Sequence, residues 1–160
     1  MAKDWLCPDD GAKTLCNFRV AGVLVRDGCL LVQRERSGDE YALPGGHVQV
    51  GEEAAQALAR EYREELGLEI LRPRMLWSEE CFWTWNGRLT HTIAFYFKID
   101  VANADLLPPP GSFVPHRDNG GVMVGWAPLS SLKDMILYPE FVKEAVYCMD
   151  EGPRHFVTRG

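Results

Sequence analysis

Three carboxylates, Glu61, Glu64 and Glu65, lie close together in a segment whose apolar residues have helical spacing. At about 100° per residue, positions i, i+3 and i+4 are neighbours on a helix, so the three side chains would share one face. Their mutual repulsion becomes attraction when they hold a divalent cation such as Mg²⁺, which prefers oxygen ligands. The spacing therefore indicates a metal-binding face, although a solvated acidic face balanced by Arg60 and Arg63 would contain the same residues.

A helix from about Glu52 to Leu66 must position these carboxylates. Gly67 is the expected terminating residue, because glycine readily adopts the left-handed conformation that follows many helix ends. A turn at residues 44–46 and a short alternating segment at residues 47–50 precede the helix. One stripe of the helix is apolar and can pack against a sheet; it consists of Ala55, Leu58, Ala59, Tyr62 and Leu66.

The residues around the carboxylates follow a longer fixed pattern. From Gly46 to Leu68 the chain reads G-x5-E-x7-R-E-U-x-E-E-x-G-U, where U is a bulky apolar residue. This pattern is the signature of the Nudix hydrolases, and the chain resembles that family at each fixed position, with Tyr62 a mild variation at the first U. The resemblance extends backwards to LPGG at residues 43–46 and forwards to a tryptophan-containing strand end at residues 125–129.

The resemblance implies the fold and the chemistry. The expected fold class is α/β, a Nudix-type α/β/α sandwich with a mixed central β-sheet, formed by residues 1–160 as a single domain. The expected reaction is metal-dependent hydrolysis of a pyrophosphate linkage in a nucleoside diphosphate derivative. Glu61, Glu64 and Glu65 match the positions that hold Mg²⁺ or Mn²⁺, and the carbonyl of Gly45 is a further candidate ligand. Glu61 or Glu64 is the expected general base, and the sequence does not separate the two.

Two further features concern the surroundings of the metal. Arg60 matches a position that orients a carboxylate of the signature, for which Glu52 is a candidate. Many family members contribute another acidic ligand from a loop before the last strand, but here Gly125 precedes Trp126. Asp118 is the nearest acidic residue upstream and is kept as a candidate substrate-site residue, so the number of metal ions stays open.

Other candidate substrate contacts lie outside the signature. Arg34 and Arg36 follow a strand near the glycine turn; they suit phosphate contacts through their forked donors, or they are ordinary surface arginines. Trp83 and Trp85 belong to an aromatic-rich stretch on which a base could stack, for roughly 1–3 kcal/mol, or which packs as core. His91 on the following strand either lines the same pocket or is a satisfied strand histidine.

Length and composition favour one ordinary globular domain of 160 residues, with 46% hydrophobic and 25% charged residues. The formal net charge is −6 and no basic run is present, which argues against a long nucleic-acid partner. Neither an apolar run of transmembrane length nor a signal-peptide pattern is found, so we expect a cytoplasmic protein without a membrane partner. Five cysteines, without a C-x-x-C pair, favour free thiols.

The remaining elements are expected to be strands and short helices, after an irregular lead-in over residues 1–16. Turn signals at residues 27–28 (DG) and 86–87 (NG) predict two hairpins. The strand at residues 89–99 is apolar on both faces and is expected to be central and covered on both sides. A final helix is expected at residues 138–150, with its proline in the first turn. The tail after it either frays or adds an edge strand.

Three interpretations of function remain. The leading one is a hydrolase of a (d)NTP-like or damaged nucleotide, and the alternative within the class is an ADP-ribose or nucleotide-sugar pyrophosphatase. Extra motifs typical of ADP-ribose, diadenosine polyphosphate and coenzyme A hydrolases are not found. A non-catalytic nucleotide sensor is the alternative of another class, but such modules typically lose glutamates that this chain retains. RNA decapping is a further possibility by analogy, but the sequence shows no basic surface that would bind RNA. Family members are often dimers, so by analogy a homodimer is also expected.

Overall fold

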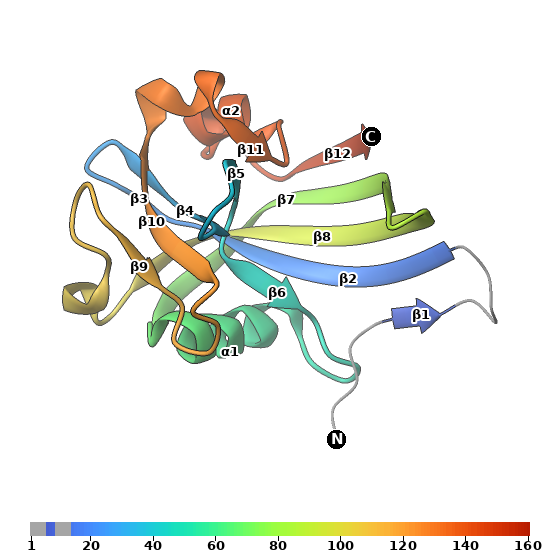
Figure 1. Ribbon diagram of the computed structural model, residues 1–160, viewed down its shortest axis with the longest axis horizontal. Helices are drawn as coiled ribbons and strands as arrows, with labels where there is room; N and C mark the ends of the chain where they lie inside the picture. The colour runs from blue at the N-terminus through green and yellow to red at the C-terminus, as the bar shows by residue number, and fades with distance from the viewer. Residues whose placement is uncertain (1–5, 9–13) are drawn as a thin grey trace.

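The computed structural model describes residues 6–8 and 14–160, so most of the expected lead-in over residues 1–16 lies outside the described residues. In this described part, two six-stranded sheets form the body of the fold, with α1 (Ala54–Leu66) on one side and α2 (Val142–Ala145) on the other (Figure 1). The expected α/β/α sandwich is confirmed. Its strands are divided between two mixed sheets instead of one, because the chain crosses from one sheet to the other at Leu24.

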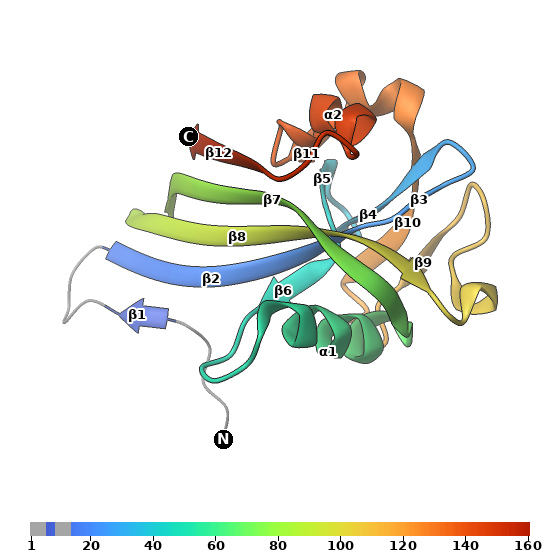
Figure 2. The ribbon, with the colours of Figure 1, turned by 180° about the vertical axis from the view of Figure 1, so that it is seen from behind.

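The first sheet contains the long strands, which run side by side across the view from behind (Figure 2). In spatial order it consists of β1 (Leu6–Pro8), β2 (Thr14–Val23), β8 (Arg88–Val101), β7 (Ile70–Trp85) and β12 (Arg154–Arg159), with β6 (Gly45–His47) also paired to β2. The pairs β2–β8 and β7–β12 are parallel, whereas β7 and β8 are antiparallel. The second sheet consists of β11 (Ile136–Tyr138), β5 (Glu40–Ala42), β4 (Cys29–Glu35), β10 (Val122–Pro128) and β9 (Phe113–Pro115), with β3 (Val25–Arg26) paired to β4.

Both predicted hairpins are confirmed. Asp27 and Gly28 turn the chain from β3 to β4 with φ of 50° and 73°, and Asn86 and Gly87 join β7 to β8 with φ of 49° and 75°. Two successive positive φ values match the twist of the flanking strands, which is why these residue pairs favour tight hairpins. The long β7–β8 hairpin forms the centre of the first sheet.

The core has two parts, one beneath each helix. Helix α1 buries Leu58, Tyr62 and Leu66 of the predicted stripe, and Ala57 beside them. It ends at Gly67, whose φ of 69° is left-handed, as predicted. The other part of the core lies near α2 and contains Trp77 and Tyr96 of the first sheet together with Leu137 and Val142.

Two expectations need correction. The strand at residues 89–99 is central in the first sheet, but Leu89 and Ile93 are exposed, because α1 covers only the other end of that face. The final helix does not begin at Tyr138, which belongs to β11 and pairs with β5. The residue before a proline is disfavoured in helical conformation, so a helix cannot readily start there. The helical turns are α2 and the 3₁₀ turn η3 (Val146–Cys148).

The residues after the final helix form the edge strand β12, which is one of the two structures expected for them. The other 3₁₀ turns of the described residues are η1 (Ala104–Leu106) and η2 (Leu129–Asp134). None of the helices in the described part of the chain has the length and apolarity needed to cross a bilayer.

Candidate active site

The glycine turn before α1 lies directly against the carboxylates of the helix. Gly46 pairs with Val20 of β2, and a Cβ at Gly46 would overlap the carboxyl group of Glu61. A Cβ at Gly45 would overlap the backbone of β2. The two glycines are therefore required by close approach, and they bring the backbone of β6 next to an acidic side chain.

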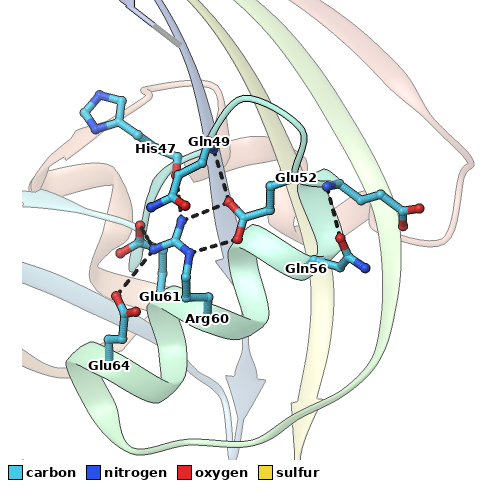
Figure 3. A network of polar contacts seen from close by, with 8 residues as sticks. His47, Gln49, Glu52, Gln56, Arg60, Glu61 and Glu64 are labelled. Carbon is cyan, nitrogen blue, oxygen red and sulfur yellow. Dashed lines mark hydrogen bonds and ion pairs between the residues drawn. The ribbon is translucent and has the colours of Figure 1, made fainter. Parts of the chain in front are cut away.

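Arg60 organises the acidic residues of the signature (Figure 3). Its Nε and Nη2 donate to the two carboxylate oxygens of Glu52 at 2.8 and 3.0 Å, which places it on the expected partner. Its Nη1 donates to Glu61 at 2.8 Å and to Glu64 at 3.4 Å. A last bond at 3.0 Å reaches the carbonyl of His47. The guanidinium lowers the pKa of Glu52 and fixes the side of α1 that faces the glycine turn.

Glu65 lies one helical turn after Glu61 on α1, and its side chain is less exposed than that of Glu64. Its Oε2 is buried and has no hydrogen-bond partner among the described residues, and Nδ1 of the buried His116 is 3.7 Å away. Burial raises the pKa of Glu65 to about 8, with further contributions from the charges of Glu61 and Asp118. Burial likewise raises the pKa of Glu61, against the opposite effect of Arg60. These two carboxyl groups therefore share a site that favours an added cation.

A loop from His116 to Gly121 closes this site. The amide of Arg117 donates to the carbonyl of Glu65 at 2.7 Å, and the charge of Asp118 acts on both Glu65 and His116. Asp118 is thus brought to the expected neighbourhood. Sequence reasoning did not single out His116, because only its contact with α1 distinguishes it from an ordinary loop histidine.

The two candidate phosphate-binding arginines support loops. Nη1 of Arg34 donates to three carbonyls of its own loop, those of Glu35, Arg36 and Gly38. Arg36 donates to the carbonyl of Gly120 from Nε at 3.1 Å and from Nη2 at 2.8 Å. Arg36 therefore anchors the loop that carries Asp118, while the bonds of Arg34 are local.

Arg19 of β2 is a cation that the sequence analysis missed. It is exposed, it lies opposite His47 of β6, and its charge acts on the pKa of both Glu61 and Glu65. No motif marks it, because it stands in a strand as one of several alternating residues. Its position makes it a better candidate for a phosphate contact than Arg34.

The aromatic candidates lie on both faces of the first sheet. Trp83 donates from its indole nitrogen to Thr92 at 3.2 Å, on the face that also contains Trp85. His91 is stacked on Phe82 at 4.2 Å between ring centroids, on the opposite face. Trp83 and His91 are therefore not brought together.

The residues fit a divalent cation in their chemistry, although they do not form a finished cage. In the described residues no group of three His, Cys, Asp or Glu side chains converges on one point. Like-charged carboxylates separate, and Arg60 draws Glu61 and Glu64 toward itself. Two features suit a hard cation: the buried oxygen of Glu65, which has no hydrogen-bond partner among the described residues, and the carboxyl group of Glu61, which lies against the backbone of Gly46.

We expect the affinity of the protein for Mn²⁺ to rise with pH up to about pH 8. The pKa of Glu65, about 8, lies above the ordinary value of 4.5, so the metal-free carboxyl holds a proton that the cation must displace. Each pH unit below this pKa should weaken binding by up to about tenfold. Titrations of Mn²⁺ followed by electron paramagnetic resonance test this, with Glu65→Gln as the variant in which the dependence on pH should be smaller. An equal slope in that variant would contradict the assignment.

Comparison with known proteins agrees with this geometry. The NUDIX domain family model matches residues 17–145, and the chain belongs to this family. A Mycobacterium tuberculosis (strain ATCC 25618 / H37Rv) protein provisionally named 8-oxo-dGTP diphosphatase 2 is 52% identical over 56 residues, covering 32% of this chain and 39% of the relative. The CTP pyrophosphohydrolase of Escherichia coli (strain K12) is 48% identical over 81 residues, covering 48% of this chain and 58% of the relative.

The chain thus spans less than two thirds of the length of these curated relatives. A crystal structure of a MutT protein from Bacillus halodurans superposes with a TM-score of 0.64 at 15% identity, covering 88% of this chain and 90% of that one. At this identity the likeness shows a shared fold.

Proposed function

We propose that the protein is a metal-dependent pyrophosphohydrolase that cleaves a (d)NTP-like or damaged nucleotide. The observation that carries the proposal is the pair of enclosed carboxyl groups, Glu61 and Glu65, beside the glycine turn, with a buried oxygen of Glu65 left without a partner. A hard cation would satisfy that oxygen and offset the charges, and it would attract an anionic diphosphate. Membership of the NUDIX family supports the same chemistry.

The residues have separate roles in this proposal. Mg²⁺ or Mn²⁺, when bound by Glu61, Glu64 and Glu65 with the carbonyl of Gly45 as a further candidate, would supply charge neutralisation and a lowered pKa for water. Arg60 holds the carboxylates in place. Glu61 or Glu64 takes the proton of the attacking water. Glu64 is the less constrained of the two, because the one hydrogen bond that the described residues give it, from Arg60, is 3.4 Å long.

Substrate choice is supported by the relatives and by the polar residues around the site. The two relatives are named for hydrolysis of 8-oxo-dGTP and of CTP, both nucleoside triphosphates. The charge of Arg19 acts on Glu61, which supports a phosphate contact by Arg19, and Trp83 offers an aromatic surface for a base. Trp85, His91, Arg34 and Arg36 remain weaker candidates for substrate contact, and Asp118 acts through its charge on Glu65.

The alternatives differ in what they would cleave. An ADP-ribose or nucleotide-sugar pyrophosphatase would use the same carboxylates on a different leaving group. A nucleotide sensor would bind without turnover, which the retained glutamates disfavour. The proposal also includes a cytoplasmic location, a small nucleotide as the partner, no long nucleic acid, and a homodimer that light scattering of the purified protein would test.

Product analysis across substrate classes tests the proposal. We expect Mg²⁺-dependent release of pyrophosphate or phosphate from at least one of the dNTPs, oxidised dNTPs or NTPs, and much slower cleavage of ADP-ribose, nucleotide sugars and dinucleoside polyphosphates. Preferred cleavage of one of the latter three would replace the substrate assignment. Nucleotide binding without cleavage in the whole panel would favour the sensor.

A further inference from the structure

Polar side chains gather on the face of the first sheet that points away from α1. Glu79 is 3% exposed and Asn17 is 6% exposed. The pairing of the strands places them on one face, because Arg19 and Glu79 both lie opposite Ala94, and Asn17 lies opposite Thr92. Apart from the catalytic carboxylates, this is the main concentration of buried polar groups in the described residues, and the chemistry above does not use it.

The carboxylate of Glu79 accepts hydrogen bonds from two hydroxyl groups and, among the described residues, forms no ion pair. Tyr96 donates to its Oε2 at 2.6 Å, and Thr158 donates to its Oε1 at 2.7 Å. In the part of the chain that the structure covers, no Lys, Arg or His forms an ion pair with it. Burial, and then the charge of Glu79, raises the pKa of both the Tyr96 hydroxyl and the Cys81 thiol.

A buried carboxylate of this kind still has hydrogen-bonding capacity. Each oxygen has two acceptor positions, and the hydroxyl groups use one on each. Leaving a buried charged group incompletely paired is costly, so N–H donors of a ligand would be favoured there. The Oδ1 of Asn17 is a second buried acceptor, and it too has no hydrogen-bond partner within the described residues. The face is thus rich in acceptors and suits a ligand that presents donors.

The C-terminal strand completes this arrangement. Thr158 belongs to β12, which lies beyond the matched NUDIX residues 17–145. The strand is firmly attached, because it pairs with β7 over its whole length and Phe156 stacks on Phe141 at 3.8 Å between ring centroids. An element outside the matched domain therefore fixes the geometry of Glu79.

Arg19 links the polar face around Glu79 electrostatically to the carboxylates of α1. The charge of Arg19 acts on Glu61 and Glu65, and also on Tyr96, which bonds to Glu79. Arg19 and Glu79 are two strand spacings apart, or about 10 Å. That is comparable with the separation between the phosphates and the base of a nucleotide, so phosphates near Arg19 would leave the base near Glu79.

We propose that Glu79, positioned by Tyr96 and by Thr158 of the C-terminal strand, is a specificity-determining residue that accepts hydrogen bonds from the amino-bearing edge of a nucleobase. This inference rests on the proposed nucleotide hydrolase function. A hydrogen bond to Glu79 would select bases that carry an exocyclic amino group, such as guanine and cytosine, over hypoxanthine and uracil, which lack one.

Two substrate pairs test the inference, dGTP against dITP and CTP against UTP. For the native protein we expect kcat/KM to favour the amino-bearing member of at least one pair by about 10- to 100-fold, the effect of one hydrogen bond to a charged group. Glu79→Gln should remove that preference chiefly through KM, since the contact is made in both ground and transition states. Thr158→Val should reduce the preference while retaining the carboxylate.

Glu80→Gln is the matched control, because Glu80 is the next residue on β7, points to the opposite face and contacts His155 of the same strand β12. It should keep the preference of the native protein. Equal kcat/KM within both pairs for the native protein, or an unchanged preference in folded Glu79→Gln and Thr158→Val variants, would overturn the inference while leaving hydrolysis intact. Absence of nucleotide cleavage by the native protein would instead remove the proposed function.

Discussion

Replacement of Glu64 by glutamine is expected to lower kcat by about 10²–10⁴-fold without changing the free energy of unfolding. The side chain of Glu64 is 54% exposed, and in the described part of the chain its one ion pair is with Arg60 at 3.4 Å, so the fold depends little on its charge. The amide is nearly isosteric, but it would remove the proposed metal ligand and base from the face of α1. Steady-state kinetics on the best nucleotide of the substrate panel and urea denaturation measure the two quantities.

Glu69→Gln is the control for this experiment. Glu69 is an exposed carboxylate just beyond α1, paired with Arg63 and outside the acidic face. The same chemical change there should leave kcat unaltered. A Glu64→Gln enzyme with native kcat and native metal dependence would exclude Glu64 from the site.

Replacement of Arg60 by glutamine should give the largest loss of stability among the polar residues of the site. The side chain of Arg60 is 22% exposed and pairs with Glu52, Glu61 and Glu64. Its loss would leave the carboxylates of Glu52 and Glu61, which are 16% and 14% exposed, without this cation, at a cost of about 2–3 kcal/mol after allowance for partial exposure. For a domain of this size that corresponds to a fall in Tm of about 5–10 °C. Thermal unfolding of the metal-free protein measures it.

Arg63 provides the matched control, because it lies on the same helix and its ion pair with Glu69 is exposed. Arg63→Gln should unfold at the native temperature. If Arg60→Gln also unfolds at the native temperature, the network in Figure 3 does not stabilise the glycine turn against α1. Arg60→Lys should recover little, since one ammonium group cannot reproduce the fork on Glu52.

Local chemistry explains which parts of the fold were predictable. Helix α1, its end at Gly67 and the two hairpins depend on residues that are neighbours in sequence. Their conformations follow from the positions of glycine and asparagine and from the spacing of apolar residues. The division into two sheets depends on pairings between distant strands, which no local pattern encodes. The final helix starts later than predicted and is shorter, because Tyr138 pairs with β5 and the helical turns begin only at Val142.

The residues of the site also fall into those that could be predicted from the sequence and those that could not. The spacing of Glu61, Glu64 and Glu65 on one helix could be predicted from the sequence, because all three belong to one local element. Arg19 and His116 could not, since each reaches α1 from a distant segment. Glu79 was hidden for the same reason, because the hydroxyl groups that hold it come from β8 and β12.

The most direct measurement of the central claim is pyrophosphate release from the best nucleoside triphosphate before and after removal of divalent cations. We predict turnover with Mg²⁺ or Mn²⁺, loss of turnover in EDTA, recovery when the cation is restored, and none of this recovery in Glu64→Gln. Equal turnover in EDTA and in Mg²⁺ would contradict metal-dependent hydrolysis at these carboxylates.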